Sequence, residues 1–106
     1  MSPRVGILGG TFDPVHHGHL VAAEETRHHL GLDRVLLVPA GHPPHKPRQP
    51  ITPAHHRLRM VELAIAPSTH LAISRVDLDR SGPSYTVDTL ALLRAELGPD
   101  ALLFFI

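Results

Sequence analysis

The sequence predicts an α/β protein in which a parallel β-sheet carries helices on its faces. Short apolar runs rich in valine, isoleucine and leucine alternate with longer segments of helical periodicity, the pattern of repeated strand–helix–strand units. Each such unit returns the next strand parallel to the previous one. A pair of glycines also follows the first apolar run directly, and sheets of this kind bind ligands at the carboxyl ends of their strands.

The first half of the chain predicts two strands around one helix. Residues 4–9 form a short β-branched run suited to a central strand, and residues 18–30 form a helix that ends at Gly31. Residues 35–38 form a second buried strand. Residues 39–53 are rich in proline, which removes hydrogen-bond donors and fixes φ, so they form a loop.

The second half repeats the alternation. Residues 54–66 predict a helix and residues 71–73 a short third strand. Residues 81–84 predict a turn with a serine placed to cap the helix at residues 85–97. A glycine–proline pair ends that helix, and residues 101–106 begin a fourth apolar strand.

Composition excludes several classes of function. The chain has 106 residues, 42% of them apolar, which is enough for the core of one small domain. Ten basic and ten acidic side chains cancel, so no positive field would hold nucleic acid or an anionic membrane. Cysteine is absent, which excludes thiol catalysis and disulfides. Without a signal-peptide stretch or an apolar run of about 18 residues, we expect a cytoplasmic protein.

Residues 9–19 carry the strongest chemical signal. They read Gly-Gly-Thr-Phe-Asp-Pro-Val-His-His-Gly-His. The paired glycines let backbone N–H groups approach an anion, and His16 and His19 can add positive charge on one side. The segment therefore predicts a phosphate site.

Simpler interpretations of the same residues remain open. Paired glycines often make an ordinary turn, and Asp13 can hold that turn by side-chain hydrogen bonds. Histidines three residues apart also bind zinc, but they would need further ligands, and His42 and His45 belong to a separate loop, so we predict no metal site. The pairs at residues 28–29 and 55–56 are expected to be solvated helix residues.

The 9–19 segment resembles the phosphate-binding signature of the nucleotidylyltransferase superfamily. Three further stretches, at residues 38–46, 57–64 and 81–90, are similar to bacterial nicotinate-nucleotide adenylyltransferases, with Pro-Pro-His-Lys and Pro-Ser-Tyr-Thr as their most specific parts. The resemblance covers essentially the whole chain. It implies a Rossmann-like parallel sheet with flanking helices, here truncated after the fourth strand.

The resemblance implies adenylyl transfer from ATP to nicotinate mononucleotide, which gives nicotinate adenine dinucleotide and pyrophosphate in NAD biosynthesis. His16 and His19 would be catalytic, contacting the ATP phosphates and stabilising the transition state. Mg²⁺ would accompany the departing pyrophosphate. The residues that the family pattern assigns to the ATP phosphates are Gly9, Gly10, Thr11, Phe12, His16, Gly18 and His19.

The same resemblance assigns Gly41, His45, Lys46 and Thr86 to the mononucleotide. Related enzymes often have asparagine or glutamine near position 41, where this chain has glycine. Lys46 would also be unremarkable as a surface lysine, and Thr86 as a residue that starts a helix.

A second family signature, Ile-Ser-x-Thr-x-x-Arg, is not among these residues. We therefore expect residues 1–106 to be the N-terminal half of a nucleotidylyltransferase domain, with an open last strand that invites self-association. The alternatives are a phosphate-binding half-domain without turnover and a related enzyme acting on nicotinamide mononucleotide or pantetheine phosphate.

Overall fold

A computed structural model describes residues 2–41, 51–80, 82 and 85–106, and these form strands and helices in the predicted order. Every boundary lies within one residue of its prediction. The elements are β1 (Arg4–Gly10), α1 (His17–Leu30), β2 (Arg34–Pro39), α2 (Ala54–Ile65), β3 (Leu71–Ile73), α3 (Thr86–Leu97) and β4 (Leu102–Phe105).

All four strands are parallel, and their order in the sheet is β3-β2-β1-β4. The chain steps outward from β1 to β2 to β3 and then returns to place β4 on the opposite side of β1. The winding direction therefore reverses at β1, so the carboxyl ends of β1 and β4 flank the position where such sheets bind ligands. The α/β, Rossmann-like class is confirmed.

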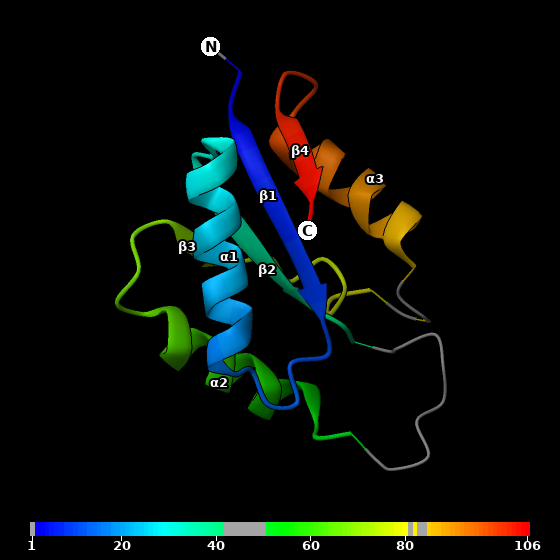
Figure 1. The fold of residues 1–106 in the computed structure, drawn as a ribbon. Helices are drawn as coiled ribbons and strands as arrows, with labels where there is room; N and C mark the ends of the chain where they lie inside the picture. Colours follow the sequence, from blue (N-terminus) through cyan, green and yellow to red (C-terminus); the bar gives the residue numbers. More distant parts are fainter. Residues whose placement is uncertain (1, 42–50, 81, 83–84) are drawn as a thin grey trace.

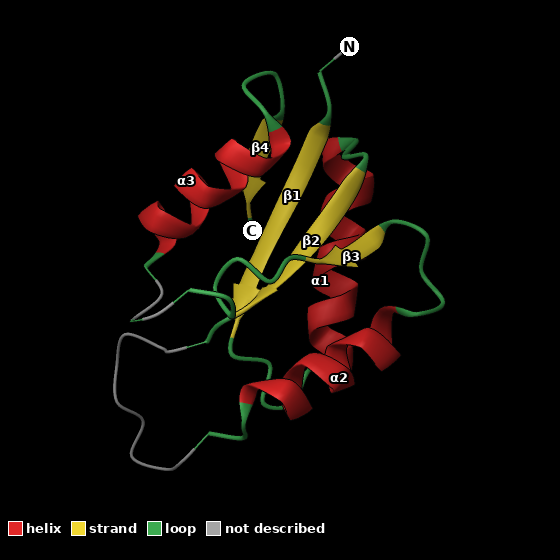
Figure 2. Ribbon diagram, turned by 180° about the vertical axis from the view of Figure 1, so that it is seen from behind, coloured by secondary structure: helices red, strands yellow, loops and turns green. Residues whose placement is uncertain are grey.

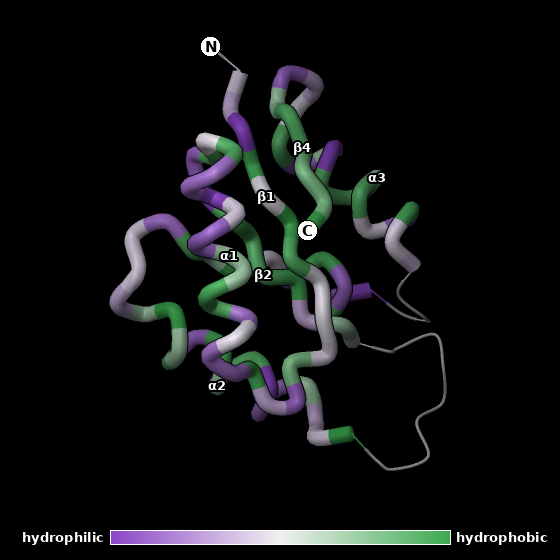
Figure 3. The backbone as a smooth tube through the Cα atoms, in the orientation of Figure 1, coloured by the Kyte–Doolittle hydropathy of each residue, from purple (hydrophilic) through white to green (hydrophobic). Residues whose placement is uncertain are grey.

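Helices cover both faces of the sheet, with α1 and α2 on one face and α3 on the other (Figures 1 and 2). Alternate residues of β2 point to opposite faces: Val35 packs with the first two helices, and Leu36 packs beside Leu93 of α3. Hydrophobic residues accordingly concentrate on the strands (Figure 3). No helix in the described ranges is long and apolar enough to cross a membrane.

The helix ends agree only in part with the predicted caps. Gly31 ends α1 in the left-handed conformation with φ 62°, as predicted. Helix α3 begins one residue later than expected, so its N-cap is Tyr85, whose side chain makes no capping hydrogen bond. The serine expected to cap it belongs to the turn at residues 81–84, of which the structure describes only residue 82.

One arginine ties together the segments at the carboxyl edge of the sheet. Arg57, in the first turn of α2, is only 1% exposed. Its Nε donates to the Thr52 carbonyl at 2.7 Å, and its Nη1 donates to the carbonyls of Thr11 and Ala40, both at 2.8 Å. Burial lowers the pKa of Arg57, but a guanidinium stays charged in proteins. One cation therefore holds the segments after β1 and β2 against the start of α2.

A carboxylate reinforces the same junction. The Thr52 backbone N–H donates to Asp13 Oδ2 at 2.7 Å, across 39 residues of sequence. Hydrogen bonds with Thr52 lower the pKa of Asp13, and the charge of Arg57 lowers it further. Asp13 thus ties the turn after β1 to a distant segment.

We expect Arg57→Met to reduce the free energy of unfolding by about 3 kcal/mol, because it removes the common donor of three carbonyls in a buried position. Arg59→Met is the matched control, since Arg59 lies exposed on the same helix. Urea unfolding of both variants measures the difference. Equal stability of the two variants would contradict the role assigned to Arg57.

Candidate active site

The two predicted catalytic histidines cap helix α1 reciprocally. His16 is the N-cap residue, and its Nδ1 accepts a hydrogen bond from the Gly18 backbone N–H at 3.1 Å. The His16 backbone N–H in turn donates to Nδ1 of His19 at 3.0 Å. A ring nitrogen that accepts carries no proton, so these bonds favour neutral imidazoles with hydrogen on Nε2. Both Nε2–H groups are then donors that take no part in the cap.

Ring packing supports the neutral state. The His16 and His19 rings stack with centroids 3.8 Å apart, and the buried Phe12 ring meets His19 edge-on at 5.0 Å. Burial lowers the pKa of His19, and the neighbouring His16 lowers it further. The hydrogen bonds to both Nδ1 atoms favour two neutral N–H donors where the sequence predicts positive charge.

Two glycines of the motif make room for these rings. A Cβ atom at Gly18 would lie 3.0 Å from Cε1 and Nδ1 of His16, and one at Gly10 would lie 3.2 Å from the Phe12 ring. Both distances are tighter than ordinary van der Waals contact. The space beside Gly18 is filled by the His16 ring, so a larger residue at this position would have to displace the capping imidazole.

Of the other motif residues, Phe12 packs in the core and Thr11 makes a hydrogen bond through its main chain. Phe12 is 2% exposed and adopts φ 52°, so its side chain belongs to the core and only its main chain is available to a phosphate. The Thr11 carbonyl is taken by Arg57.

A cavity of about 170 Å³ opens at the carboxyl ends of β1, β2 and β4. It brings together Gly9 and Gly10 of the first motif and Thr86, the first residue of α3, which lie far apart in sequence. Its other lining residues are Ile7, Val38, Ala40, Asp77, Thr89 and Phe105. The cavity lies where the winding of the sheet reverses, the position at which sheets of this kind bind ligands.

Of the four residues predicted to bind the acceptor, only Gly41 and Thr86 are among the described residues. Gly41 follows Ala40 at the cavity, and a Cβ atom there would lie 2.5 Å from the Asp77 carbonyl oxygen. A side chain at this position would force the two segments apart. His45 and Lys46, like His42, lie outside the described residues.

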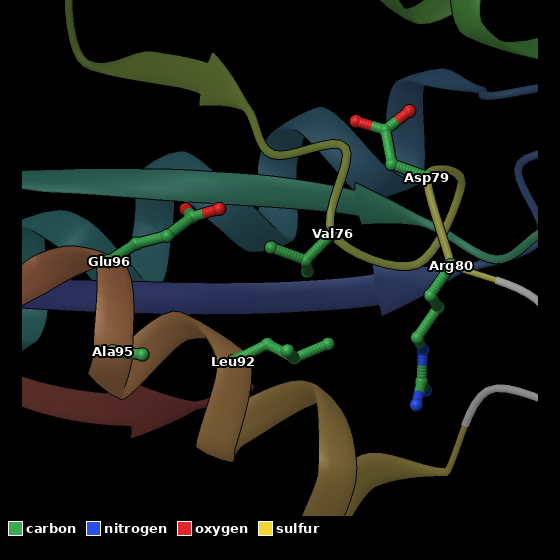
Figure 4. A pocket seen from close by; sticks show the side chains of 6 residues that line it. All are labelled: Val76, Asp79, Arg80, Leu92, Ala95 and Glu96. Atoms are coloured by element: carbon green, nitrogen blue, oxygen red, sulfur yellow. The ribbon is translucent and has the colours of Figure 1, made fainter.

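A larger cavity, of about 420 Å³, lies between the segment after β3 and helix α3, and Figure 4 shows the side chains that line it. Val76 and Leu92 form its apolar part, and none of the predicted phosphate-site residues line it. The described part of the chain contains no group of three histidine, aspartate or glutamate residues that could hold a metal ion.

Sequence reasoning missed three residues that shape the site: Arg57, Asp77 and Thr89. A cation in the first turn of α2 opposes the helix dipole, and that conflict was a usable sign of a specific role for Arg57. Asp77 and Thr89 gave no such sign, because their contact joins a loop to a helix 12 residues later.

The comparisons with known proteins agree on one family. A family model described as cytidylyltransferase-like matches residues 7–106. A probable nicotinate-nucleotide adenylyltransferase of Thermomicrobium roseum is 57% identical over 101 residues, covering 95% of this chain and 47% of that protein. One of Corynebacterium kroppenstedtii is 56% identical over 104 residues, covering 98% and 49%. The chain spans about half the length of the curated relatives it matches.

Solved structures show the same fold. A Plasmodium falciparum nicotinic acid mononucleotide adenylyltransferase complexed with APC superposes with a TM-score of 0.71 at 25% identity, covering 97% of this chain and 49% of that one. The same enzyme complexed with NaAD gives a TM-score of 0.73 at 23% identity, covering 97% and 50%.

We expect His19 to take up a proton only below pH 6.5, because burial and His16 lower its pKa from that ordinary value. As pH falls below about 6.5, His19 takes up a proton in the unfolded chain before it does so in the folded chain. The contribution of the neutral His19 cap to folding stability is therefore fully present above about pH 6.5 and is lost as pH falls through the pKa of His19 in the folded chain. Heteronuclear NMR of the ring nitrogens measures the titration, with the exposed His55 as reference. A His19 midpoint above 6.5 would contradict the neutral capping pair.

Proposed function

This chain belongs to the cytidylyltransferase-like family, and on that premise we propose that it supplies the phosphate-binding half of an adenylyltransferase. The reaction is transfer of the adenylyl group of ATP to nicotinate mononucleotide, yielding nicotinate adenine dinucleotide and pyrophosphate. Relatives named as probable nicotinate-nucleotide adenylyltransferases support this choice of substrates. The proposed domain unit is residues 1–106, as the N-terminal half.

The observation that carries the proposal is the interlocked pair of imidazoles beside the glycine turn. Their Nδ1 atoms are committed to backbone N–H groups, so each ring presents an Nε2–H donor of fixed orientation. Preorganised donors of this kind stabilise charge that develops on phosphate without reorganising during the reaction. The backbone N–H groups of Gly10 and Thr11 are the proposed partners of the remaining phosphate oxygens.

The proposed role of these residues is to align the two substrates and to disperse the negative charge that develops on the phosphate oxygens. The mononucleotide phosphate attacks the α-phosphorus of ATP in line, one phosphorus–oxygen bond forms, and the bond to pyrophosphate breaks. No covalent intermediate with the protein is needed. His16 and His19 would donate to the oxygens on which negative charge grows.

The acceptor is proposed to lie in the cavity that Thr86 shares with the glycine turn. Thr86 is the first residue of α3, where backbone N–H groups lack intrahelical acceptors and favour a carboxylate. Such donors would select the acid over the amide. Gly41, His45 and Lys46 are proposed to complete the acceptor side.

Mg²⁺ is proposed as the cofactor, held by the phosphates of ATP, because the described residues offer no carboxylate cage. The ion would neutralise charge on the departing pyrophosphate. We also propose a cytoplasmic site of action and self-association through the outer edge of β4, which lies at the edge of the sheet.

The direct test is to incubate the full-length protein with ATP and one of three acceptors, and to measure pyrophosphate release. The acceptors are nicotinate mononucleotide, nicotinamide mononucleotide and pantetheine phosphate. Release with nicotinate mononucleotide well above that with nicotinamide mononucleotide or pantetheine phosphate supports the proposal. ATP binding without release in any of the three reactions supports a phosphate-binding module instead.

We expect His19→Ala in the full-length protein to lower kcat by about 10²-fold while changing the KM for the mononucleotide little, because the lost contact acts on the transition state. His28→Ala is the control, since His28 lies exposed on the same helix. An unchanged kcat in His19→Ala would overturn the catalytic assignment.

Replacing Lys46 with alanine is expected to raise the KM for the mononucleotide and to leave that for ATP nearly unchanged, because this cation is assigned to the acceptor phosphate. Steady-state kinetics with each substrate varied in turn separate the two constants. A rise confined to ATP would place Lys46 on the other substrate.

A further inference from the structure

A buried carboxylate that the proposed reaction does not use lies beside the cavity. Asp77, in the segment after β3, is 5% exposed. Its Oδ1 accepts a hydrogen bond from the Thr89 hydroxyl at 2.8 Å. Thr89 is itself only 7% exposed, and both residues line the cavity together with Thr86. A polar pair this well buried requires a reason to be retained.

Asp77 connects the two segments assigned to the acceptor. Its carbonyl oxygen lies so close to Gly41, in the segment after β2, that a side chain at position 41 would collide with it. Its carboxylate holds Thr89, three residues after Thr86 and therefore on the same face of α3. This bond joins the first turn of α3 to the segment after β3.

The remainder of α3 has an independent anchor. Leu93 lies one turn further along the helix, is fully buried, and packs in the core with Val5 and Ile7 of β1. Loss of the Thr89 hydroxyl should therefore release the first turn without detaching the helix, and the effect should be local to the cavity.

A buried anion beside an anionic substrate would ordinarily repel it, and Arg80 offsets that charge. Arg80 Nη2 lies 3.2 Å from Asp77 Oδ1, and Figure 4 shows the Arg80 side chain extending towards the start of α3. Asp79, two residues after Asp77, points away from α3 in the same view and pairs with Arg75 instead. Asp77 therefore contacts α3 through Thr89, whereas Asp79 pairs with Arg75 on its own segment.

We propose that Asp77 and Thr89 are positioning residues for the acceptor: their hydrogen bond sets Thr86 in the cavity, and Arg80 keeps the pair compatible with an anionic mononucleotide. The inference rests on the proposed function and adds to it residues that the family resemblance did not assign. It makes acceptor binding depend on a hydrogen bond between two residues of the protein.

The test uses Thr89→Val, which keeps the side-chain shape and removes the hydroxyl, and Thr89→Ser, which keeps the hydroxyl. In the full-length protein we expect Thr89→Val to raise the KM for nicotinate mononucleotide about tenfold, the scale of one hydrogen bond to a charged group. The KM for ATP should stay unchanged, and Thr89→Ser should behave as wild type. Equal rises in both constants, no rise, or the same defect in serine and valine would each overturn the proposal.

Asp77→Ala provides the second arm, with Asp79→Ala as its matched control on the same segment. We expect the same selective rise for Asp77→Ala and wild-type constants for Asp79→Ala. If Asp77→Ala does not fold, the two Thr89 variants decide the matter alone. Wild-type protein that does not use nicotinate mononucleotide overturns the proposed function, whereas active wild type with an unchanged Thr89→Val overturns only the positioning role.

Discussion

The architecture of the carboxyl edge depends on one buried guanidinium. Parallel strands deliver their loops to the same edge, and nothing in strand pairing fixes how those loops lie against one another. Arg57 supplies that constraint, because its planar donors meet carbonyls from the segments after β1 and β2 and from the start of α2. The bonds are made to main-chain atoms, so the arrangement constrains backbone position whatever side chains the loops carry.

The glycine-rich motif combines packing with binding more closely than its sequence indicates. The Phe12 ring packs beside Gly10 and the His16 ring packs beside Gly18, so two residues that the resemblance assigns to the ATP phosphates also serve packing. The rings placed in this way then hold each other in a fixed orientation. Core packing and the proposed catalytic geometry are thus satisfied by the same few residues.

The strands and helices were predictable because their signals are local. Hydrophobic periodicity located each element, and Gly31 marked the end of α1 through its left-handed conformation. The position of the cavity beside the glycine pair followed from topology, since the winding reversal and that pair coincide at one edge. The histidine cap was harder, because helix N-caps are usually serine, threonine, aspartate or asparagine. The contacts of Arg57 and Asp77 join residues that only the folded chain brings together, and no spacing in the sequence encodes them.

The capping histidines affect how strongly phosphate binding at the proposed site would depend on salt. Attraction between opposite charges weakens as salt is added, whereas a hydrogen bond from a neutral donor depends on distance and direction and is scarcely screened. Because both Nδ1 atoms accept from the backbone, the donors offered on the Nε2 side are uncharged. A phosphate held there would be recognised by the geometry of its oxygens rather than by its total charge, and that part of the affinity would be insensitive to ionic strength.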